Sequence, residues 1–300
     1  MTDDSRRALL SVQELADLLA NADNLVLLDV RWQLGGPSQY PAYLSGRIPG
    51  ARWCDLDADL ADPPGARGRH PLPDPARLQA RFADWGIAPD AEIVVYDGGS
   101  SVAAARAWWV LRWAGVGRVR VLDGGFAAWA EGDQPVETGE TVGQHADRVG
   151  STATAVATVR PGALPVLDAE TARAWAEQGR LVDVRAPERF RGEVEPMDPV
   201  AGHIPGALNI PTTGNAISSG RFKPAPALRR RFDEAGIDVQ APVGVYCGSG
   251  VNAAHTALAM EAAGITAVLY PGSWSEWVTD PQRPVATGAP TPAADPPARC

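Results

Sequence analysis

One cysteine in this sequence stands where a thiol could act as a nucleophile. Cys247 follows an apolar-leaning run, residues 243–246, that predicts a short buried strand, and it precedes the Gly-Ser-Gly turn at 248–250. A helical run, residues 251–263, begins at once and is closed by Gly264, a residue typical of the position after a helix. Because a helix start directs its backbone N–H groups and its dipole at such a turn, a thiolate there is stabilised. The spacing predicts an anion cradle with a reactive thiol at its head.

The glycines of this turn support that interpretation. Gly248 and Gly250 let the backbone curl inward where a Cβ would clash. The alternative is that Cys247 is a small buried hydrophobe at a strand end, because free cysteine is often buried. The other two cysteines, Cys54 and Cys300, are too scattered for a disulfide framework or a zinc site. We therefore expect one working thiol, no metal and no cofactor.

The loop after Cys247 differs in composition from the phosphate-binding loop of cysteine phosphatases. Cysteine phosphatases carry an arginine in the same loop, and its guanidinium clamps an oxyanion through two hydrogen bonds. This chain has Ala253 at the expected position, followed by Ala254. Phosphate recognition is therefore unsupported, and a cysteine phosphatase-like enzyme is kept only as a distant alternative.

The bulk composition is that of a globular protein. The chain has 300 residues, of which 45% are hydrophobic and 21% charged, enough for one large domain or two of ordinary size. Its net charge of -9 argues against nucleic acid or an anionic membrane as the main partner. No apolar run approaches the roughly 20 residues that span a bilayer, and the N-terminal residues do not resemble a signal peptide. We expect a cytosolic protein.

The sequence repeats itself once. Five blocks of the first half return in the same order about 150 residues later, an offset far longer than the period of a solenoid. Such a pattern indicates a duplicated domain. The matching pairs are residues 27–31 and 181–185, 46–51 and 202–207, 82–87 and 232–237, 95–98 and 245–248, and 124–129 and 272–277.

Each half alternates predicted helices and strands. Ser11 and Glu14 have the spacing of a capping box before one helix, and Asp168 is placed to cap another, over residues 169–178. Apolar runs typical of strands covered on both faces recur in both halves, so we expect an α/β fold with a mostly parallel sheet and helices on both faces, once per half. These runs are residues 25–30 and 181–184, 93–96 and 243–246, and 119–122 and 267–270.

The composition also suggests where the domains end. Residues 137–165 include a Gly/Thr/Ala-rich stretch with weak periodicity and are predicted to be a linker between domains at 8–136 and 166–286. The Pro/Ala-rich tail, residues 287–300, is predicted to be disordered. Cys300 lies in this tail and is not expected to take part in chemistry.

At its repeated motifs the chain resembles the two-domain rhodanese family, the thiosulfate and 3-mercaptopyruvate sulfurtransferases. The resemblance covers about residues 10–285 and is carried by the two DVR triplets, the block at 202–207, the Cys-Gly-Ser-Gly-Val loop at 247–251 and the block at 272–277. It implies two tandem rhodanese-like domains, the C-terminal one active and the N-terminal one inactive. It also implies that the cysteine takes a sulfane sulfur from a small-molecule donor, becomes a persulfide, and passes the sulfur to cyanide or a thiol.

The duplication agrees with that division of labour. Asp97 occupies the position in the first half that Cys247 occupies in the second. A carboxylate cannot accept a sulfane sulfur, and an anion cradle there would be filled by the chain itself. We therefore expect the first half to be structural or substrate-facing.

The resemblance assigns roles to further residues. It implies that Ser249 relays a proton together with Asp57, that His70 is a first-domain residue near the substrate, and that Arg189 binds the anionic end of the donor. The alternatives are an ordinary solvated acidic residue for Asp57, a loop histidine without a function for His70, and a surface arginine for Arg189. The expected loop contacts to substrate come from Gly248, Gly250, Val251 and Asn252, where Asn252 replaces a family threonine and both types can cap a helix.

The identity of the donor stays open between thiosulfate and 3-mercaptopyruvate. The neutral residues Gly248 and Ser249 resemble the mercaptopyruvate branch, whereas Met197 stands where many of those enzymes have a second arginine. Arg31 and Arg185 recur in both halves, and recurrence without the cysteine favours a structural ion pair over catalysis.

Two further interpretations concern packing and class. Trp274 and Trp277 are expected to pack in the core or at a domain interface rather than to stack on substrate. The alternative from another functional class is a non-catalytic binding or sulfur-carrier module, because rhodanese-type domains can persist after activity is lost. The intact loop at Cys247 argues against it.

Overall fold

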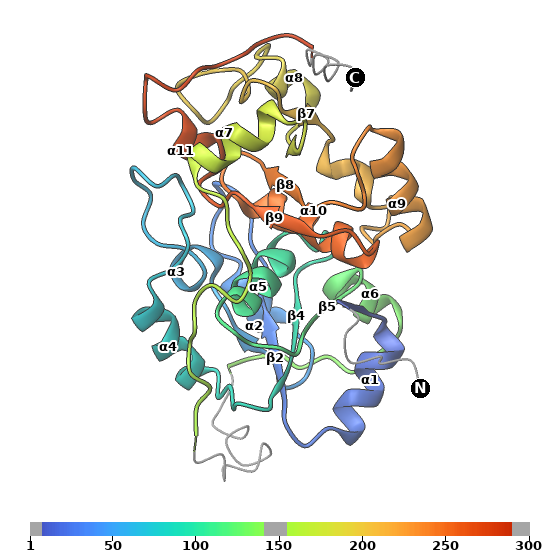
Figure 1. Cartoon of the computed structure of the whole chain (residues 1–300). Coiled ribbons are helices and arrows are strands. Elements are labelled where there is room, and N and C mark those ends of the chain that lie inside the picture. Colours follow the sequence, from blue (N-terminus) through green and yellow to red (C-terminus); the bar gives the residue numbers. More distant parts are fainter. Residues whose placement is uncertain (1–7, 141–154, 290–300) are drawn as a thin grey trace. The chain divides into compact units, whose positions relative to one another are not determined.

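The structure, a computed structural model, describes residues 8–140 and 155–289 and divides them into two compact units. Unit 1 contains residues 8–62, 72–140, 155–165 and 216–223, and unit 2 contains residues 63–71, 166–215 and 224–289. Figure 1 labels elements of both units where there is room. Part of the predicted linker, residues 141–154, and the predicted disordered tail from residue 290 on, with Cys300, lie outside the described residues.

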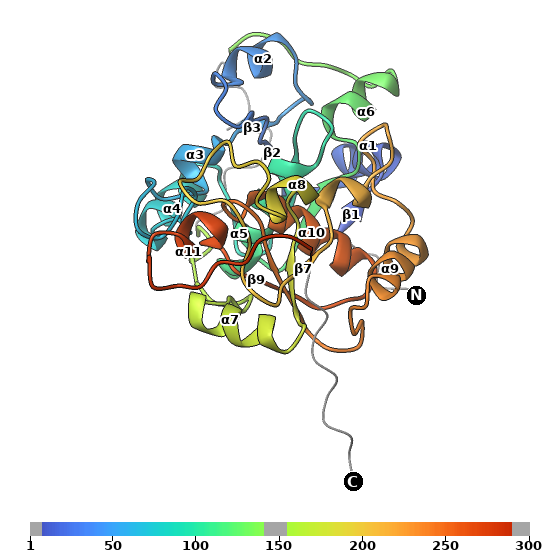
Figure 2. The same cartoon turned by 90° about the horizontal axis from the view of Figure 1, so that it is seen from above.

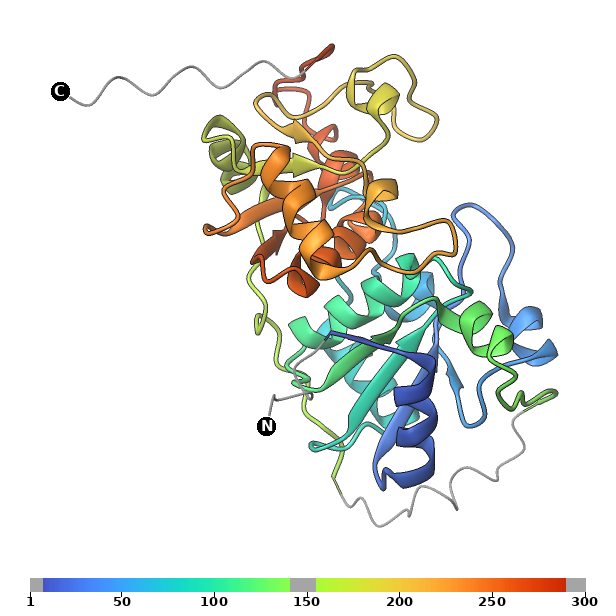
Figure 3. The ribbon, with the colours of Figure 1, turned by 90° about the vertical axis from the view of Figure 1, so that its right-hand side faces the viewer.

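Unit 1 is built on a five-stranded sheet with the order β1-β5-β4-β2-β3, in which all pairs are parallel. Parallel strands need crossover connections, and the helices between them supply these. Figure 3 shows the strands side by side with α1 along the sheet. The strands are β1 (Leu9–Leu10), β2 (Leu25–Asp29), β3 (Arg52–Trp53), β4 (Glu92–Tyr96) and β5 (Val119–Leu122). The helices are α1 (Val12–Asn21), α2 (Tyr40–Ser45), α3 (Leu56–Asp59), α4 (Pro75–Asp84), α5 (Val102–Trp113) and α6 (Gly125–Glu131).

Unit 2 repeats this plan with a parallel four-stranded sheet in the order β7-β6-β8-β9. Helix α9 packs beside α10 (Figure 2), and α10 packs on β8 and β9. The strands are β6 (Leu181–Asp183), β7 (Leu208–Asn209), β8 (Val243–Tyr246) and β9 (Ala267–Leu269). The helices are α7 (Ala169–Glu177), α8 (Pro187–Phe190), the 3-10 helix η2 (Thr212–Asn215), α9 (Ala225–Glu234), α10 (Val251–Ala262) and α11 (Ser273–Trp277).

Each sheet is covered by helices on both faces. Successive side chains of a strand point to opposite sides, so an apolar strand needs packing partners on both of them. In unit 1, Leu27 and Val94 pack in one cluster with Leu15 of α1 and Trp129 of α6, while α5 packs against β4 and β5. In unit 2, the corresponding cluster joins the sheet to α7 and α11, and α10 contacts the sheet as well. The α/β fold with two parallel sheets, expected from the sequence, is confirmed.

Corresponding contacts recur in the two units. Tyr96 at the end of β4 accepts a hydrogen bond on its hydroxyl from the N–H of Ile48 (3.2 Å), and Tyr246 at the end of β8 accepts one from Ile204 (3.1 Å). Both donors lie in the repeated Ile-Pro-Gly-Ala motif. The duplication seen in the sequence is therefore also a duplication of tertiary contacts.

Within residues 8–140 and 155–289, no helix combines the length and apolar character needed to cross a membrane.

Candidate active site

The Cys247 loop lies at the carboxyl end of β8, a central strand of the unit 2 sheet. Gly250 caps α10 with a φ of 82°, a left-handed conformation that glycine adopts at little cost. The side chain of Cys247 is buried, with 2% exposed, and the N–H of Gly250 donates a hydrogen bond to its Sγ (3.1 Å). The first N–H groups of α10 have no acceptor within the helix. The N–H of Gly250 thus faces the sulfur at the start of a helix, as the spacing predicted, and the stabilisation of a thiolate there stays a prediction.

The start of α11 fixes the loop from the side of β9. Ser273 accepts a hydrogen bond from the Cys247 N–H (3.1 Å) and donates its own hydroxyl to the carbonyl of Tyr270 (2.9 Å). The N–H groups of Trp274 and Ser275 donate to the carbonyls of Cys247 and Gly248, at 3.0 and 2.9 Å. The Gly-Ser-Trp-Ser block at 272–275, the counterpart of residues 124–127, therefore holds the backbone of the cradle.

Unit 1 shows the same cradle with its own carboxylate inside it. The side chain of Asp97 is buried and accepts hydrogen bonds from the N–H groups of Gly99 (2.8 Å), Ser101 (2.9 Å) and Ala103 (3.1 Å). Burial raises the pKa of Asp97, although these N–H groups oppose the shift. The sequence suggested that the cradle of the first half is filled by the chain itself, and the structure shows the Asp97 carboxylate in that place.

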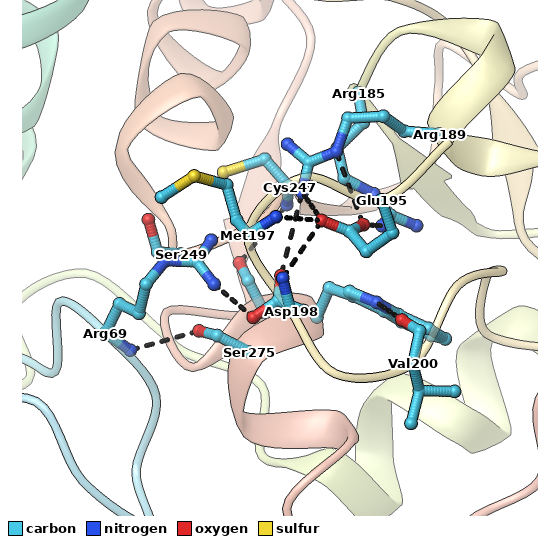
Figure 4. A network of polar contacts seen from close by, with 12 residues as sticks. Arg69, Arg185, Arg189, Glu195, Met197, Asp198, Val200, Cys247, Ser249 and Ser275 are labelled. Atoms are coloured by element: carbon cyan, nitrogen blue, oxygen red, sulfur yellow. Dashed lines mark hydrogen bonds and ion pairs between the residues drawn. The ribbon is translucent and has the colours of Figure 1, made fainter. Parts of the chain in front are cut away.

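Ser249 of the loop pairs with a histidine far away in the sequence. The Oγ of Ser249 lies 2.7 Å from Nδ1 of His70, and both side chains are buried. His70 belongs to residues 63–71, which pack with unit 2. The N–H of Arg69 donates to Ser275 Oγ (3.0 Å), which ties this segment to α11 (Figure 4). The hydroxyl of Ser249, two positions after Cys247 in the sequence, is therefore hydrogen-bonded to an imidazole that can give or take a proton.

Arg189 reaches the loop from α8. Its guanidinium donates to the carboxylate of Glu195 (2.6 Å), and its Nη2 lies 3.6 Å from Asp198 Oδ2 (Figure 4). A Cβ placed on Gly248 would lie 3.6 Å from both terminal nitrogens of Arg189. The arginine predicted to bind the donor thus flanks the cysteine loop, and its role in binding stays a prediction.

The two arginines of the DVR triplets form structural ion pairs, as recurrence suggested. Arg185 donates to Asp183 and to the carbonyl of Gly202, each at 2.6 Å. Arg31 makes the matching contacts with Asp29 and the carbonyl of Gly46, each also at 2.6 Å.

Glu195 contacts both Arg185, which is paired with Asp183, and Arg189, which flanks the cysteine loop. It accepts from Arg185 (3.3 Å) and Arg189 (2.6 Å), and from the N–H groups of Met197 (3.0 Å) and Asp198 (3.1 Å). Burial by itself raises the pKa of Glu195, but the hydrogen bonds from Arg189 and Met197 outweigh it, so the pKa lies below its usual range. Met197 itself is 43% exposed and brings no charge.

The structure places Asn252 and Asp57 within helices. Asn252 is the second residue of α10, because Gly250 already occupies the cap position without any side-chain cap hydrogen bond. The expectation that Asn252 caps the helix is therefore wrong, whereas Val251 is buried as the first helical residue.

Asp57 belongs to unit 1, in the first turn of α3, where its carboxylate accepts a hydrogen bond from Trp32 Nε1 (2.9 Å). Its part in proton relay stays a prediction.

The two tryptophans of α11 are core residues. Trp274 and Trp277 are buried in the unit 2 cluster, and their indole N–H groups donate to the carbonyls of Val200 (2.9 Å) and Pro284 (3.0 Å). The interpretation of these residues as packing residues is confirmed.

Sequence reasoning missed the charged groups that surround Arg189. Arg69 forms an ion pair with Asp198, and a Cβ on Gly248 would lie 2.8 Å from Arg69 Nη2. Two signals were available: Arg69 precedes His70 directly, and Glu195 and Asp198 flank Met197. Neither signal shows which cation meets which anion.

Comparison with known proteins agrees with this geometry. The family model described as "Rhodanese-like domain" matches residues 11–132 and 168–280. The chain is 44% identical over 283 residues to "Putative thiosulfate sulfurtransferase SseB" of Mycobacterium tuberculosis, covering 94% of this chain and 98% of the relative. It is 46% identical over 294 residues to "Probable 3-mercaptopyruvate sulfurtransferase" of Pseudomonas aeruginosa, covering 95% and 99%.

A solved structure shows the same architecture. The crystal structure of SseA from Escherichia coli, described as a 3-mercaptopyruvate sulfotransferase with the "Rhodanese" fold, is similar with a TM-score of 0.74 and 30% identity. The match covers 90% of this chain and 99% of that one. With two matched domains, a shared fold and relatives aligned along almost their whole length, this chain belongs to the rhodanese family and carries two rhodanese-like domains in tandem.

Proposed function

We propose that this protein is a sulfurtransferase in which Cys247 carries the sulfur. Its thiolate takes a sulfane sulfur from thiosulfate or 3-mercaptopyruvate and passes it, as a persulfide, to cyanide or a thiol. The observation that carries the proposal is the buried Sγ of Cys247, which accepts the N–H of Gly250 in a loop flanked by Arg189. The names of the relatives from Mycobacterium tuberculosis and Pseudomonas aeruginosa support it.

With thiosulfate the reaction needs no proton. The Cys247 thiolate attacks the outer sulfur, a new S–S bond forms, and the S–S bond of the donor breaks so that sulfite leaves with the electron pair. The persulfide then loses its terminal sulfur to cyanide, which yields thiocyanate and restores the thiolate. The N–H groups at the start of α10 stabilise the negative sulfur in each state.

With 3-mercaptopyruvate a proton must move. The Cys247 thiolate attacks the donor sulfur and the C–S bond breaks, so the electron pair goes to the carbon of an enolate. The proton from the donor thiol must reach that carbon to give pyruvate. We assign this proton transfer to two side chains, Ser249 and His70, which are hydrogen-bonded to each other at 2.7 Å.

We propose that the two domains, at residues 8–136 and 166–286, divide the work. In the first domain, the carboxylate of Asp97 occupies the cradle by accepting its N–H groups. That domain therefore has a structural role or faces the substrate. Residues 137–165 are the proposed linker. The cytosolic location stays a prediction from the sequence.

The test is the fate of sulfur on Cys247. The wild type is expected to gain about 32 Da, one sulfur atom, after treatment with a donor, and to form thiocyanate when cyanide is added. Cys247→Ser should do neither, whereas Cys54→Ser, which removes a buried thiol of unit 1, should do both. Thiocyanate formation by Cys247→Ser would contradict the assigned nucleophile. A wild type that gains no sulfur would favour the non-catalytic binding module.

The donor is then decided by kcat/KM for thiosulfate beside 3-mercaptopyruvate, each with cyanide and with a thiol as the acceptor.

A further inference from the structure

One serine of α11 joins the cysteine loop to the segment that carries His70. The N–H of Ser275 donates to the carbonyl of Gly248 (2.9 Å), and its hydroxyl oxygen accepts the N–H of Arg69 (3.0 Å; Figure 4). The side chain is buried, with 8% exposed. Its own O–H donates to the carbonyl of Gly272 (3.1 Å), which turns a lone pair of the oxygen toward Arg69. Ser275 therefore contacts both segments at once.

These contacts close a ring around the proposed proton carriers. Arg69 is followed directly by His70, whose Nδ1 lies 2.7 Å from Ser249 Oγ. Ser249 is in turn bonded to Gly248, whose carbonyl accepts the N–H of Ser275. The position of the imidazole relative to the hydroxyl of Ser249 is thus set through Ser275 from both sides.

The segment of residues 63–71 passes α11 at the distance of a backbone contact. Gly68 has a φ of 97°, a conformation that residues with a side chain rarely adopt. A Cβ there would lie 2.7 Å from the carbonyl oxygen of Gly272 and 2.9 Å from Ser275 Oγ. Because Gly68 has no Cβ, the next N–H along the chain, that of Arg69, can reach the hydroxyl of Ser275.

The duplication supplies a comparison within the same chain. Ala127 of α6 is the counterpart of Ser275, and its N–H donates to the carbonyl of Gly98 (3.2 Å), as that of Ser275 donates to Gly248. In unit 1 the backbone bond that holds the loop is therefore made without a hydroxyl. What the hydroxyl of Ser275 adds in unit 2 is the contact with Arg69.

We propose that Ser275 is a positioning residue of the proton transfer, and that its hydroxyl holds the N–H of Arg69 so that His70 faces Ser249. This inference rests on the proposed function, since it concerns the proton transfer assigned there to Ser249 and His70. Ser275 acts through His70 and takes no part in the bond changes at the donor. Its hydroxyl matters for 3-mercaptopyruvate, whose reaction needs a proton, and not for thiosulfate, whose reaction needs none.

The first test compares kcat for the two donors, with saturating cyanide, in the full chain carrying Ser275→Ala. With 3-mercaptopyruvate, the loss of one hydrogen bond predicts a fall in kcat of about three- to tenfold. This fall is smaller than that expected for His70→Asn, because the ion pair of Arg69 with Asp198 still holds the segment. With thiosulfate, kcat should change by no more than about twofold, since sulfite leaves without a proton. Ser275→Thr, which keeps a hydroxyl, should restore the rate with 3-mercaptopyruvate.

Two further variants separate the hydroxyl from general packing. Ser101→Ala removes a buried hydroxyl of unit 1 that has no hydrogen-bond partner among the described residues, and it should leave kcat unchanged for both donors. Gly68→Ala moves the segment of residues 63–71 and leaves Ser275 in place, so it should lower kcat selectively for 3-mercaptopyruvate. It also keeps the proposal testable should Ser275→Ala fail to fold.

A double-mutant cycle decides whether Ser275 acts through His70. If it does, Ser275→Ala lowers kcat for 3-mercaptopyruvate no further in a protein that already carries His70→Asn. An equal additional loss in that protein would overturn the proposal, because the serine would then act independently of the imidazole. A fall in kcat of the same size with both donors would overturn it as well, since the hydroxyl would then only hold the loop.

Failure of the positioning role is distinct from failure of the proposed function. A wild type that forms thiocyanate, while Ser275→Ala keeps the wild-type kcat with 3-mercaptopyruvate, overturns the positioning role and leaves the sulfurtransferase intact. A wild type that acquires no sulfur on Cys247 from either donor overturns both.

Discussion

The hydroxyl oxygen of Ser249 lies 2.7 Å from Nδ1 of His70, although 179 positions separate the two residues in the chain. Both side chains are buried, so this hydrogen bond is protected from exchange with bulk water. The pair stands beside Cys247 and can hold or move a proton at the hydroxyl of Ser249. This relationship distinguishes the two candidate donors, because only one of them needs a proton to reach its leaving group.

The first prediction concerns proton transfer. Ser249→Ala and His70→Asn should each lower kcat for 3-mercaptopyruvate by about 10- to 100-fold, since a positioned acid or base contributes at least this much in many enzymes. The same variants should change kcat for thiosulfate by no more than about twofold, because sulfite leaves without a proton. Steady-state rates of thiocyanate formation with the two donors measure the difference. Equal losses with both donors would show that the pair holds the loop rather than moves a proton.

The second prediction concerns the filled cradle of unit 1. Asp97→Ala should destabilise the protein by about 1–3 kcal/mol, because the buried N–H groups of Ser101 and Ala103 and the partly buried N–H of Gly99 lose their acceptor. Most of the sulfurtransferase rate should remain. Thermal unfolding and thiocyanate assays of the folded variant check both statements. A large fall in kcat with an intact fold would mean that unit 1 takes part in the chemistry.

The third prediction concerns acid stability. The pKa of Glu195 is below its usual range in the folded protein, so ionised Glu195 contributes stability at pH values above the usual range of a glutamate, near 4.3. That contribution is lost as the pH falls through the lower, folded-state pKa. Glu195→Gln should therefore lower Tm at pH 7, and the difference from the wild type should shrink toward pH 3. The exposed Glu170 provides a control, since Glu170→Gln should change Tm little at either pH. A difference that grows on acidification would reverse the sign and contradict the role of this ion pair.

The fourth prediction concerns Met197. Its side chain is 43% exposed and lies in the segment that carries Glu195 and Asp198, so an arginine there can be accommodated. Met197→Arg should raise the ratio of kcat/KM for 3-mercaptopyruvate over thiosulfate by about tenfold, the value of one charge-assisted hydrogen bond to a carboxylate. The matched control is Met197→Gln, which is polar but uncharged. If the donor ratio stays the same in both variants, Met197 has no part in selecting the donor.

Local patterns determined much of this protein from the sequence alone. The runs at β8 and α10, with Gly250 and Gly264 at the ends of the helix, follow from apolar periodicity and from the left-handed conformations that glycine tolerates. The repeated blocks predicted two similar parallel sheets. The exchange of Cys247 for Asp97 predicted a cradle filled from within. These features depend on residues close together in the chain, or on the comparison of one half with the other.

Local patterns were insufficient where contacts are distant or elements are very short. The strands β1, β3 and β7 have two residues each, too few to show alternation, and their pairing to the neighbouring strands defines them. Asn252 was expected to cap α10, but the cap position depends on where the turn places Gly250.

Only the tertiary structure decided the partners of the charged groups at the site. Arg69 meets Asp198 across 129 positions of the chain, and His70 meets Ser249 across 179. No periodicity links such residues, because an ion pair or hydrogen bond depends on distance in space and not on spacing in sequence. The sequence by itself thus predicted Cys247 as the sulfur-carrying residue at the head of a glycine-spaced loop, and the structure contains that loop. The folding of residues 63–71 onto unit 2 decided that Arg69 and His70 lie beside it.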